Sequence, residues 1–419
     1  MFREKRGNAW AVMLLIGVFS MVFLLGPGYA TAQVKPIKVG YLAPRTGPAA
    51  SNAKDMVDAM TMTVDEFGGK IAGRPIQVIV EDTEGKPAVG LVKARKLVIE
   101  DGCKVIAGPL LGHVNNAVSP FLNEQKIPFL TNAASPADLT LQNLTPWMIR
   151  TVFSGPQLSH PFGEYAYKVM GLRRVATISL DYAFGYDVVG GFCKTFQDAG
   201  GKVIQKTWTP LTALDLAPYL AQVDKSADAL FSLYWGSFSL RFVKQVVEAG
   251  LKGKMAILGG VTTVDEHCLR NMGDEAIGIV SSCNWSAALD TPEAKAYVTA
   301  YRKRYNLDPS YYSEMSYSLF KWLFLALQKV DGNVEDSEKL FKAILSLKFN
   351  GARGPLELDN YRNANQNIYI RRVDKVGGKL QNTVLHTYPN VKQNWIWPME
   401  EYIKRPEYSR DYPPCPDCK

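Results

Sequence analysis

Residues of the types that hold small anions gather in Ile127–Thr140, which reads IPFLTNAASPADLT. An apolar run ends at Leu130, and small and hydroxyl side chains follow from Asn132 to Ser135. Small residues let a ligand approach the backbone, where free N–H groups act as donors, and Ser135 adds a hydroxyl. An ordinary strand-to-loop junction has the same composition, so the rest of the chain must decide between the two interpretations.

Cysteine and histidine do not form a recognisable metal or redox motif. The pair Cys415 and Cys418 supplies only two metal ligands, and no helix follows it to lower a thiol pKa. We therefore expect a local disulfide there, and a packed thiol at Cys193. The four histidines, His113, His160, His267 and His386, lack ligand spacing. Without HExxH, GxSxG or GxxxxGK[ST] motifs, we expect no catalytic residue, metal or cofactor.

Strand-like and helix-like segments alternate twice along the chain, and this pattern predicts the frame that positions Ile127–Thr140. Strands are expected at 37–42, 76–80, 105–107 and 127–130, then again at 175–180, 203–208, 229–234 and 255–258. Three consecutive helices and three short strands follow, and 394–419 is expected to be an extended tail. The fold class is therefore α/β, with two doubly wound lobes.

Composition and charge indicate an exported globular protein. Of the 419 residues, 47% are hydrophobic and 21% charged, which suits two domains. The net charge of +8 is dispersed, so a nucleic-acid partner is not expected. A basic start, the apolar run Trp10–Leu25 and the small residues Ala30–Ala32 predict a signal peptide over residues 1–32. A retained membrane anchor is the alternative; otherwise the protein is expected in the periplasm.

The ordered segments of the chain resemble the solute-binding proteins of branched-chain amino acid ABC importers. The resemblance covers about Pro36 to Tyr388. Its pieces, none specific alone, are Ile37–Leu42 followed by Thr46–Pro48, Ile106–Pro109, Pro128–Ser135, Arg150–Phe153, Asp181–Gly185, Gly354–Asp359 and Ile368–Val373. The resemblance implies a type I periplasmic binding protein fold, in which two lobes joined by three crossover segments close on a ligand.

The same resemblance implies domain boundaries and partners. Lobe one would span 34–153 plus 285–355, and lobe two 154–284 plus 356–392, with a C-terminal tail over 393–419. The expected function is to capture a small carboxylate-bearing solute and deliver it to a membrane permease, as a monomer. A sensor subunit with the same fold and, more remotely, an exported hydrolase are the alternatives.

Carried over residue by residue, the resemblance places the ligand carboxylate on lobe one. Gly112 stands where the family has a hydroxyl residue, so only its N–H is available, and Ala133 and Ser135 would provide backbone groups and a hydroxyl. Lobe two would close with aromatic side chains. The remaining candidates lie in neighbouring strand-end turns: Arg45, Thr46, Tyr182, Phe184, Phe238 and Thr262, with His113 as an alternative donor. Arg45 or His113 would replace the missing hydroxyl donor, but the favoured interpretation of both is that they are solvated loop residues.

The segment Leu258–Thr263 departs from the family pattern. Amino-acid binders place a carboxylate near this segment to pair the ligand ammonium, whereas this chain has Gly259, Gly260 and Val261. A closed cleft that leaves an ammonium unpaired is strongly disfavoured. Unless Asp181 or Asp265 takes that role, the ligand is expected to be an aromatic acid, an apolar acid or an amide.

Overall fold

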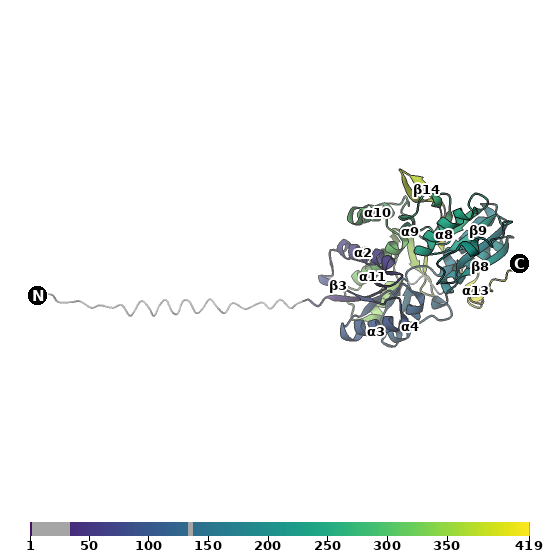
Figure 1. The fold of residues 1–419 in the computed structure, drawn as a ribbon. Helices are drawn as coiled ribbons and strands as arrows, with labels where there is room; N and C mark the ends of the chain where they lie inside the picture. The colour runs from purple at the N-terminus through teal and green to yellow at the C-terminus, as the bar shows by residue number, and fades with distance from the viewer. Residues whose placement is uncertain (2–33, 133–136, 419) are drawn as a thin grey trace. The chain divides into compact units, whose positions relative to one another are not determined.

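The computed structural model describes residues 1, 34–132 and 137–418 (Figure 1). The chain divides into the units Met1–Lys35 and Pro36–Lys419, and every helix and strand described belongs to the second unit. The expected signal peptide lies outside the described residues except for Met1. Within the described residues, no helix is long and apolar enough to cross a membrane.

A six-stranded sheet forms from the first part of this unit, in the order β2-β3-β1-β4-β5-β6. Its strands are β1 (Ile37–Ala43), β2 (Lys70–Ile71), β3 (Arg74–Asp82), β4 (Val105–Ala107), β5 (Phe129–Thr131) and β6 (Met148–Arg150). Except for β2 with β3, the pairs are parallel. In β1, IKVGYLA, all but one residue is buried, as expected for a parallel strand covered on both faces.

Helices follow the strands of this sheet as the alternating pattern predicts. They are α2 (Ala50–Glu66), α3 (Pro87–Arg95) with its π-helical turn η1 (Lys96–Glu100), α4 (Gly112–Glu124) and the 3-10 turn η2 (Ala137–Thr140). Close packing depends on Gly40 in β1, where a Cβ atom would lie 2.5 Å from Ile106 Cδ1 of β4 and 3.0 Å from Leu97 Cδ1 of η1.

A nine-stranded sheet forms the second half, in the order β12-β13-β14-β11-β10-β9-β7-β8, with β15 paired to β14. The parallel part contains β7 (Arg174–Leu180), β8 (Lys202–Thr209), β9 (Ala229–Leu233), β10 (Ala256–Gly259) and β11 (Val280–Cys283). The antiparallel part adds β12 (Lys348–Gly351), β13 (Gly354–Leu358), β14 (Ala364–Val376) and β15 (Lys379–Val391). Sequence analysis predicted β14 and β15 as much shorter strands.

Helices and 3-10 turns connect these strands. They are η3 (Gly155–Leu158), α5 (His160–Lys168), α6 (Ala183–Asp198), α7 (Ala217–Leu220), α8 (Ser237–Glu248), α9 (Glu266–Leu269) and η4 (Asp274–Ala276). Together with the two sheets they give the α/β architecture that the alternating pattern predicts.

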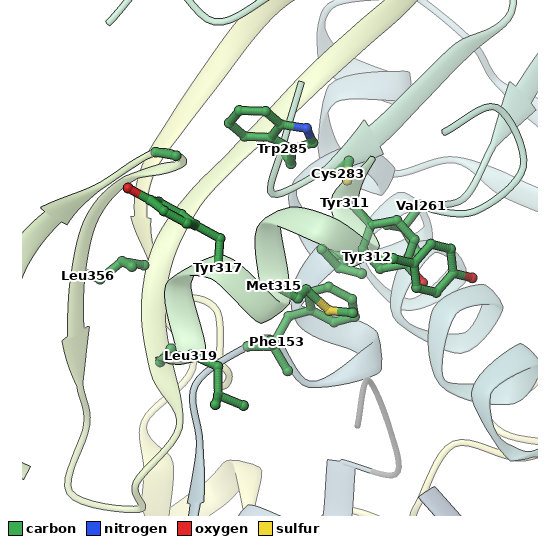
Figure 2. Packing of buried hydrophobic residues seen from close by; sticks show 14 of the residues in the cluster. Phe153, Val261, Cys283, Trp285, Tyr311, Tyr312, Met315, Tyr317, Leu319 and Leu356 are labelled. Atoms are coloured by element: carbon green, nitrogen blue, oxygen red, sulfur yellow. The ribbon is translucent and has the colours of Figure 1, made fainter. Parts of the chain in front are cut away.

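The chain then returns through helices α10 (Pro292–Tyr305), α11 (Tyr311–Lys329) and α12 (Ser337–Leu345). Helix α11 packs along α2, and most of its side chains are buried. Figure 2 shows Tyr311 and Tyr312 at one end of this helix, near Val261 and Cys283. The first residues of α11 therefore meet loops of the nine-stranded sheet, while its middle packs against the helix that follows β1.

The predicted lobe boundaries can be compared with the ends of the strands, although the division into lobes stays a prediction. The boundary after Phe153 falls between β6 and η3, and the boundary after Asn284 falls beyond β11. The boundary after Pro355 falls within β13, which pairs with both β12 and β14.

The C-terminal segment differs from the extended tail expected from its sequence. It contains the short helix α13 (Met399–Tyr402), and Trp397 and Tyr402 stack with their ring centroids 5.8 Å apart. His160 of α5 lies against both rings and contacts the Tyr408 hydroxyl at 3.0 Å. Cys415 and Cys418 form the expected disulfide. Cys193 is buried, as predicted.

Candidate functional site

A cavity of about 540 Å³ lies at the carboxyl ends of strands from both sheets. This is where α/β sheets bind ligands, and the volume is within the usual range for small-molecule sites. From the six-stranded sheet side it is lined by Thr46, Pro48, Ala49, Asn52, Glu84, Gly85, Leu110, Leu111, Gly112, His113 and Asn116. From the other side it is lined by Tyr182, Ala183, Phe184, Leu211, Trp235 and Thr262, and α11 adds Tyr311 and Tyr312.

Aromatic side chains form the nine-stranded sheet side of the cavity. Tyr182 and Phe184 follow β7 and meet edge to face, with ring centroids 6.2 Å apart. Trp235 follows β9. Burial raises the pKa of Tyr182 far above 10, and a hydrogen bond from Trp235 opposes this rise only in part. The phenol is therefore neutral at any physiological pH, so this side offers ring faces and no charge.

Tyr311 and Tyr312 provide the aromatic surface that α11 adds. Their ring centroids are 4.0 Å apart, and both residues are buried. Ser310 caps the helix by accepting a hydrogen bond from the Ser313 N–H, which fixes the first turn. Burial raises the pKa of both phenols well above 10. These tyrosines thus remain neutral beside the apolar side chains of the cavity.

Hydrogen-bond donors come from the first turn of α4. This helix begins at Gly112, and its cap residue makes no side-chain hydrogen bond to the turn. The first N–H groups of a helix have no partner within it, and the helix dipole makes them attractive to an anion. His113 Nε2 donates to the Gly85 carbonyl at 2.9 Å, so its ring ties α4 to the loop after β3. Gly112 therefore lines the cavity, and the role of its N–H as a carboxylate donor stays a prediction.

The two predicted threonines line the cavity, but both hydroxyl groups already donate hydrogen bonds to other groups of the protein. Thr46 Oγ1 donates to Asp82 at 2.7 Å, and Thr262 Oγ1 donates to the Tyr234 carbonyl at 2.6 Å. Each hydroxyl can still accept a hydrogen bond. Neither can donate to a ligand carboxylate without losing its present partner.

Four predicted residues are not seen in the cavity lining. Arg45 is exposed, and its backbone N–H donates a hydrogen bond to Asp82 Oδ1 at 2.8 Å. Phe238 is half-buried and meets the lining residue Trp235 edge to face, with ring centroids 6.0 Å apart. Ala133 and Ser135 lie outside the described residues, so their roles stay predictions.

The carboxylates proposed to pair a ligand ammonium have other partners. Asp181 binds Arg410 and accepts a hydrogen bond from Tyr186. Asp265 caps α9 through the Cys268 N–H at 2.9 Å, and burial raises its pKa to about 6. Neither residue lines the cavity. Among the described lining residues, the carboxylate present is Glu84, which lies 2.8 Å from Lys86 Nζ.

Sequence reasoning missed several lining residues, among them Glu84, Asn52, Trp235 and the α11 tyrosines. Trp235 could have been found, because it stands at a strand end beside the predicted Phe238. Tyr311 and Tyr312 gave no such signal, since they begin a helix and enter the cavity through the packing of α11 on α2. Among the described residues, no cluster of histidine, cysteine or acidic side chains could hold a metal ion.

The sequence profile of a family described as periplasmic binding protein matches residues 36–379. A protein from Brucella melitensis named Leu/Ile/Val-binding protein homolog 6 is 28% identical over 88% of this chain and 95% of its own. A solute binding protein of an ABC transporter from Rhodopseudomonas palustris BisB5, solved with 3,4-dihydroxybenzoic acid, is 33% identical. It covers 85% of this chain and 98% of its own with a TM-score of 0.81.

A further solute binding protein of an ABC transporter, from Rhodopseudomonas palustris HaA2, was solved with p-hydroxybenzoic acid. It is 29% identical, covers 86% of this chain and 98% of its own, and has a TM-score of 0.80. The similarity to these proteins therefore extends over both sheets and the cavity between their strand ends.

Proposed function

Because this chain belongs to the periplasmic binding protein family, we propose that it captures a small aromatic carboxylate between its two lobes. It is a solute-binding protein and not an enzyme, like the relatives that it matches. In this proposal the lobes close on the solute, and a membrane permease of an ABC transporter receives it in the periplasm.

The aromatic lining of the cavity carries this proposal. Tyr182, Phe184, Trp235, Tyr311 and Tyr312 all border the same space. Flat rings stack and meet edge to face with other rings, so such a lining favours an aromatic solute over a branched aliphatic one. The relatives described with hydroxylated benzoic acids support the same class.

The carboxylate of the solute is proposed to bind at the first turn of α4. There the N–H of Gly112 and the N–H of His113 face no partner within the helix. Charge-assisted hydrogen bonds from such groups are among the stronger ones. Ser135 would add a hydroxyl, as the sequence predicts, and Ser135→Ala is expected to weaken binding.

Glu84 supports a second candidate, a branched-chain amino acid. Its carboxylate borders the cavity and could pair an ammonium if it left Lys86. Because the Glu84 side chain is 44% exposed, water screens such a pair and it adds little to affinity. This second candidate predicts that Glu84→Gln weakens leucine binding severalfold, whereas the aromatic-acid proposal predicts nearly unchanged affinity for 4-hydroxybenzoate.

A thermal-shift screen of the purified protein tests the proposal. The panel contains benzoate, 4-hydroxybenzoate, 3,4-dihydroxybenzoate, leucine, valine and benzamide. A ligand at one hundred times its dissociation constant stabilises the folded state by about 2.7 kcal/mol, so a true ligand raises the melting temperature in a dose-dependent way. The aromatic acids should do so. Stabilisation by leucine and valine alone would contradict the proposal, as would turnover of any hit.

A further inference from the structure

Asp55 of α2 is the centre of a buried polar cluster beside the cavity. It is 3% exposed and receives two hydrogen bonds from Arg270, to Oδ1 at 3.1 Å and to Oδ2 at 3.0 Å. His267 Nδ1 lies 3.1 Å from Asp55 Oδ2, and the Ser310 hydroxyl donates to the same oxygen at 2.6 Å. His267 Nε2 lies 3.2 Å from the Ser51 hydroxyl. The imidazole is therefore held at both nitrogens by residues of α2.

This cluster joins the two halves of the molecule. In the chain, helix α2 lies between β1 and β2 of the six-stranded sheet, whereas α9 and Arg270 lie between β10 and β11 of the nine-stranded sheet. Arg270 also donates to the Asp308 carbonyl at 2.7 Å, just before α11 begins. The contacts of His267 and Arg270 therefore link the segment between β10 and β11 to α2 and to the residues just before α11.

The cluster also borders the proposed binding cavity. Ala49 and Asn52, at the start of α2, line the cavity, while Ser51 and Asp55 of the same turns contact His267. The His267 ring meets the lining residue Tyr312 edge to face, with centroids 5.8 Å apart. A motion that opened the cavity between α2 and the nine-stranded sheet would pull α9 away from Asp55.

We propose that Asp55, His267 and Arg270 form a closure latch, a set of positioning residues that hold the lobes together without touching the solute. The latch rests on the proposed capture of a solute by lobe closure. It assigns to α2 and α9 a role in setting the balance between open and closed forms. Protonation of His267 gives Asp55 a second cationic partner and tightens the latch.

The charges around His267 support this proton dependence. Burial alone would lower the pKa of His267, but the hydrogen bond to Asp55 and the charges of Asp265 and Asp55 raise it above 6.5, against the opposing charge of Arg270. Burial likewise raises the pKa of Asp55, and its bonds with His267 and Arg270 more than reverse this. Burial keeps Tyr312 neutral by raising its pKa. Asp55 thus stays ionised while His267 titrates.

Whether closure is favoured at low or at high pH depends on which form, latched or open, binds the His267 proton more tightly. The latched form holds the His267 proton more tightly than an open form, in which the imidazole returns toward a pKa of 6.5. Closure is therefore favoured most below pH 6.5, and the gain disappears as pH rises through the raised pKa. Asp265 titrates near 6, so measurements at pH 6.5 and above keep its contribution small.

Electron–electron distance measurements on the purified protein, without any solute, test the latch. Spin labels are placed at two exposed positions, Lys70→Cys on β2 of the six-stranded sheet and Lys244→Cys on α8, the helix that follows β9 of the nine-stranded sheet. The four native free cysteines are buried and should stay unlabelled. The fraction of molecules with the short interlobe distance should be several-fold larger at pH 6.5 than at pH 8.5.

His267→Gln should remove this pH dependence, since glutamine keeps the polar contacts but does not titrate. His386→Gln is the matched control, because His386 is exposed on β15 and its ring contacts Tyr165 and Tyr388. It should behave as the parent protein does. A pH-independent distance in the parent, or a retained pH dependence in His267→Gln, would overturn the latch.

Calorimetry with 4-hydroxybenzoate adds a second readout. If that compound binds, its affinity should rise between pH 8.5 and 6.5 in the parent and in His386→Gln, but not in His267→Gln. An affinity rise of the same size in His267→Gln would also overturn the latch. If 4-hydroxybenzoate does not bind, the proposed solute class fails, while the distance measurement still decides on the latch.

Discussion

At the level of single residues, cavity-lining residues that follow a strand could be predicted from the sequence. Lining residues that reach the cavity through the packing of a distant helix could not. Thr46, Gly112, Tyr182, Phe184 and Thr262 follow strands and line one cavity. A strand end is visible as an apolar run that stops, so these positions could be found. The hydrogen-bond partners of these residues could not be predicted, because the acceptors are distant in the sequence, as Asp82 is for Thr46.

Phe184→Ala tests the aromatic side of the cavity. Phe184 is 7% exposed and borders the cavity, so removing its ring takes away contact area that a bound aromatic acid would cover. The loss for a Phe-sized side chain is about 1.5–3 kcal/mol, or about ten- to a hundredfold in the dissociation constant for 4-hydroxybenzoate measured by calorimetry. Phe238→Ala should change affinity only slightly, because Phe238 is not among the residues that line the cavity. Equal losses in the two variants would contradict this assignment.

Glu314→Gln tests the buried ion pair that fastens α11. Glu314 and Arg353 side chains are both fully buried and lie 2.7 Å apart, and Arg353 also donates to the Thr151 carbonyl. Removing the carboxylate leaves a buried cation unpaired, so unfolding in urea should show a loss of about 3–5 kcal/mol.

Lys295→Ala is the control for this measurement. Lys295 pairs with Asp290 at the surface, with side chains 64% and 88% exposed. Its removal should cost less than about 1 kcal/mol. Similar losses of unfolding free energy in Glu314→Gln and Lys295→Ala would show that the buried ion pair contributes no more to stability than an exposed pair.

At the level of elements, the sequence predicted most strands and helices but not the lengths of the last two strands. β14 and β15 continue well beyond their apolar stretches, because they pair with each other along an antiparallel ladder. Pairing partners satisfy the backbone there, so polar residues are tolerated and the apolar pattern ends early. The short helix α13 and the ring contacts of the C-terminal segment were not predicted, for a related reason. Its aromatic residues have no period, and their partner is His160, far away in the sequence.

His160→Gln tests how the C-terminal segment is docked. Burial lowers the pKa of His160 well below 6.5, and the charges of Arg405 and Lys194 lower it further. The folded protein therefore keeps the ring neutral, while the unfolded chain protonates it below pH 6.5. Folding stability should fall by about 1.4 kcal/mol per pH unit below 6.5 from this group alone.

The measurement is urea unfolding of both proteins at pH 7.5 and 5.5. His160→Gln should lose less stability than the parent over this interval, because glutamine binds no proton. Other titrating groups contribute equally to both proteins, so the difference between them isolates His160. Identical losses would mean that His160 is not held neutral by the docked segment.

At the level of the whole molecule, the two-lobe α/β fold could be predicted because strand and helix patterns repeat and the family segments appear in order. Membership of the periplasmic binding protein family confirms that prediction. The class of solute could be predicted only by elimination, from the missing carboxylate near Gly259. The structure adds positive grounds, since aromatic rings that follow β7 and β9 and that begin α11 border the cavity, and Asp181 and Asp265 bind elsewhere.

The central claim is that the cavity takes an aromatic carboxylate without an ammonium group. Calorimetry with 3-phenylpropanoate and phenylalanine tests it most directly, because these two acids differ only in the ammonium. We expect 3-phenylpropanoate to bind more tightly, since phenylalanine must bury a charge that lacks a dedicated partner. Tighter binding of phenylalanine would contradict the claim and would assign Glu84 or another carboxylate to the ammonium.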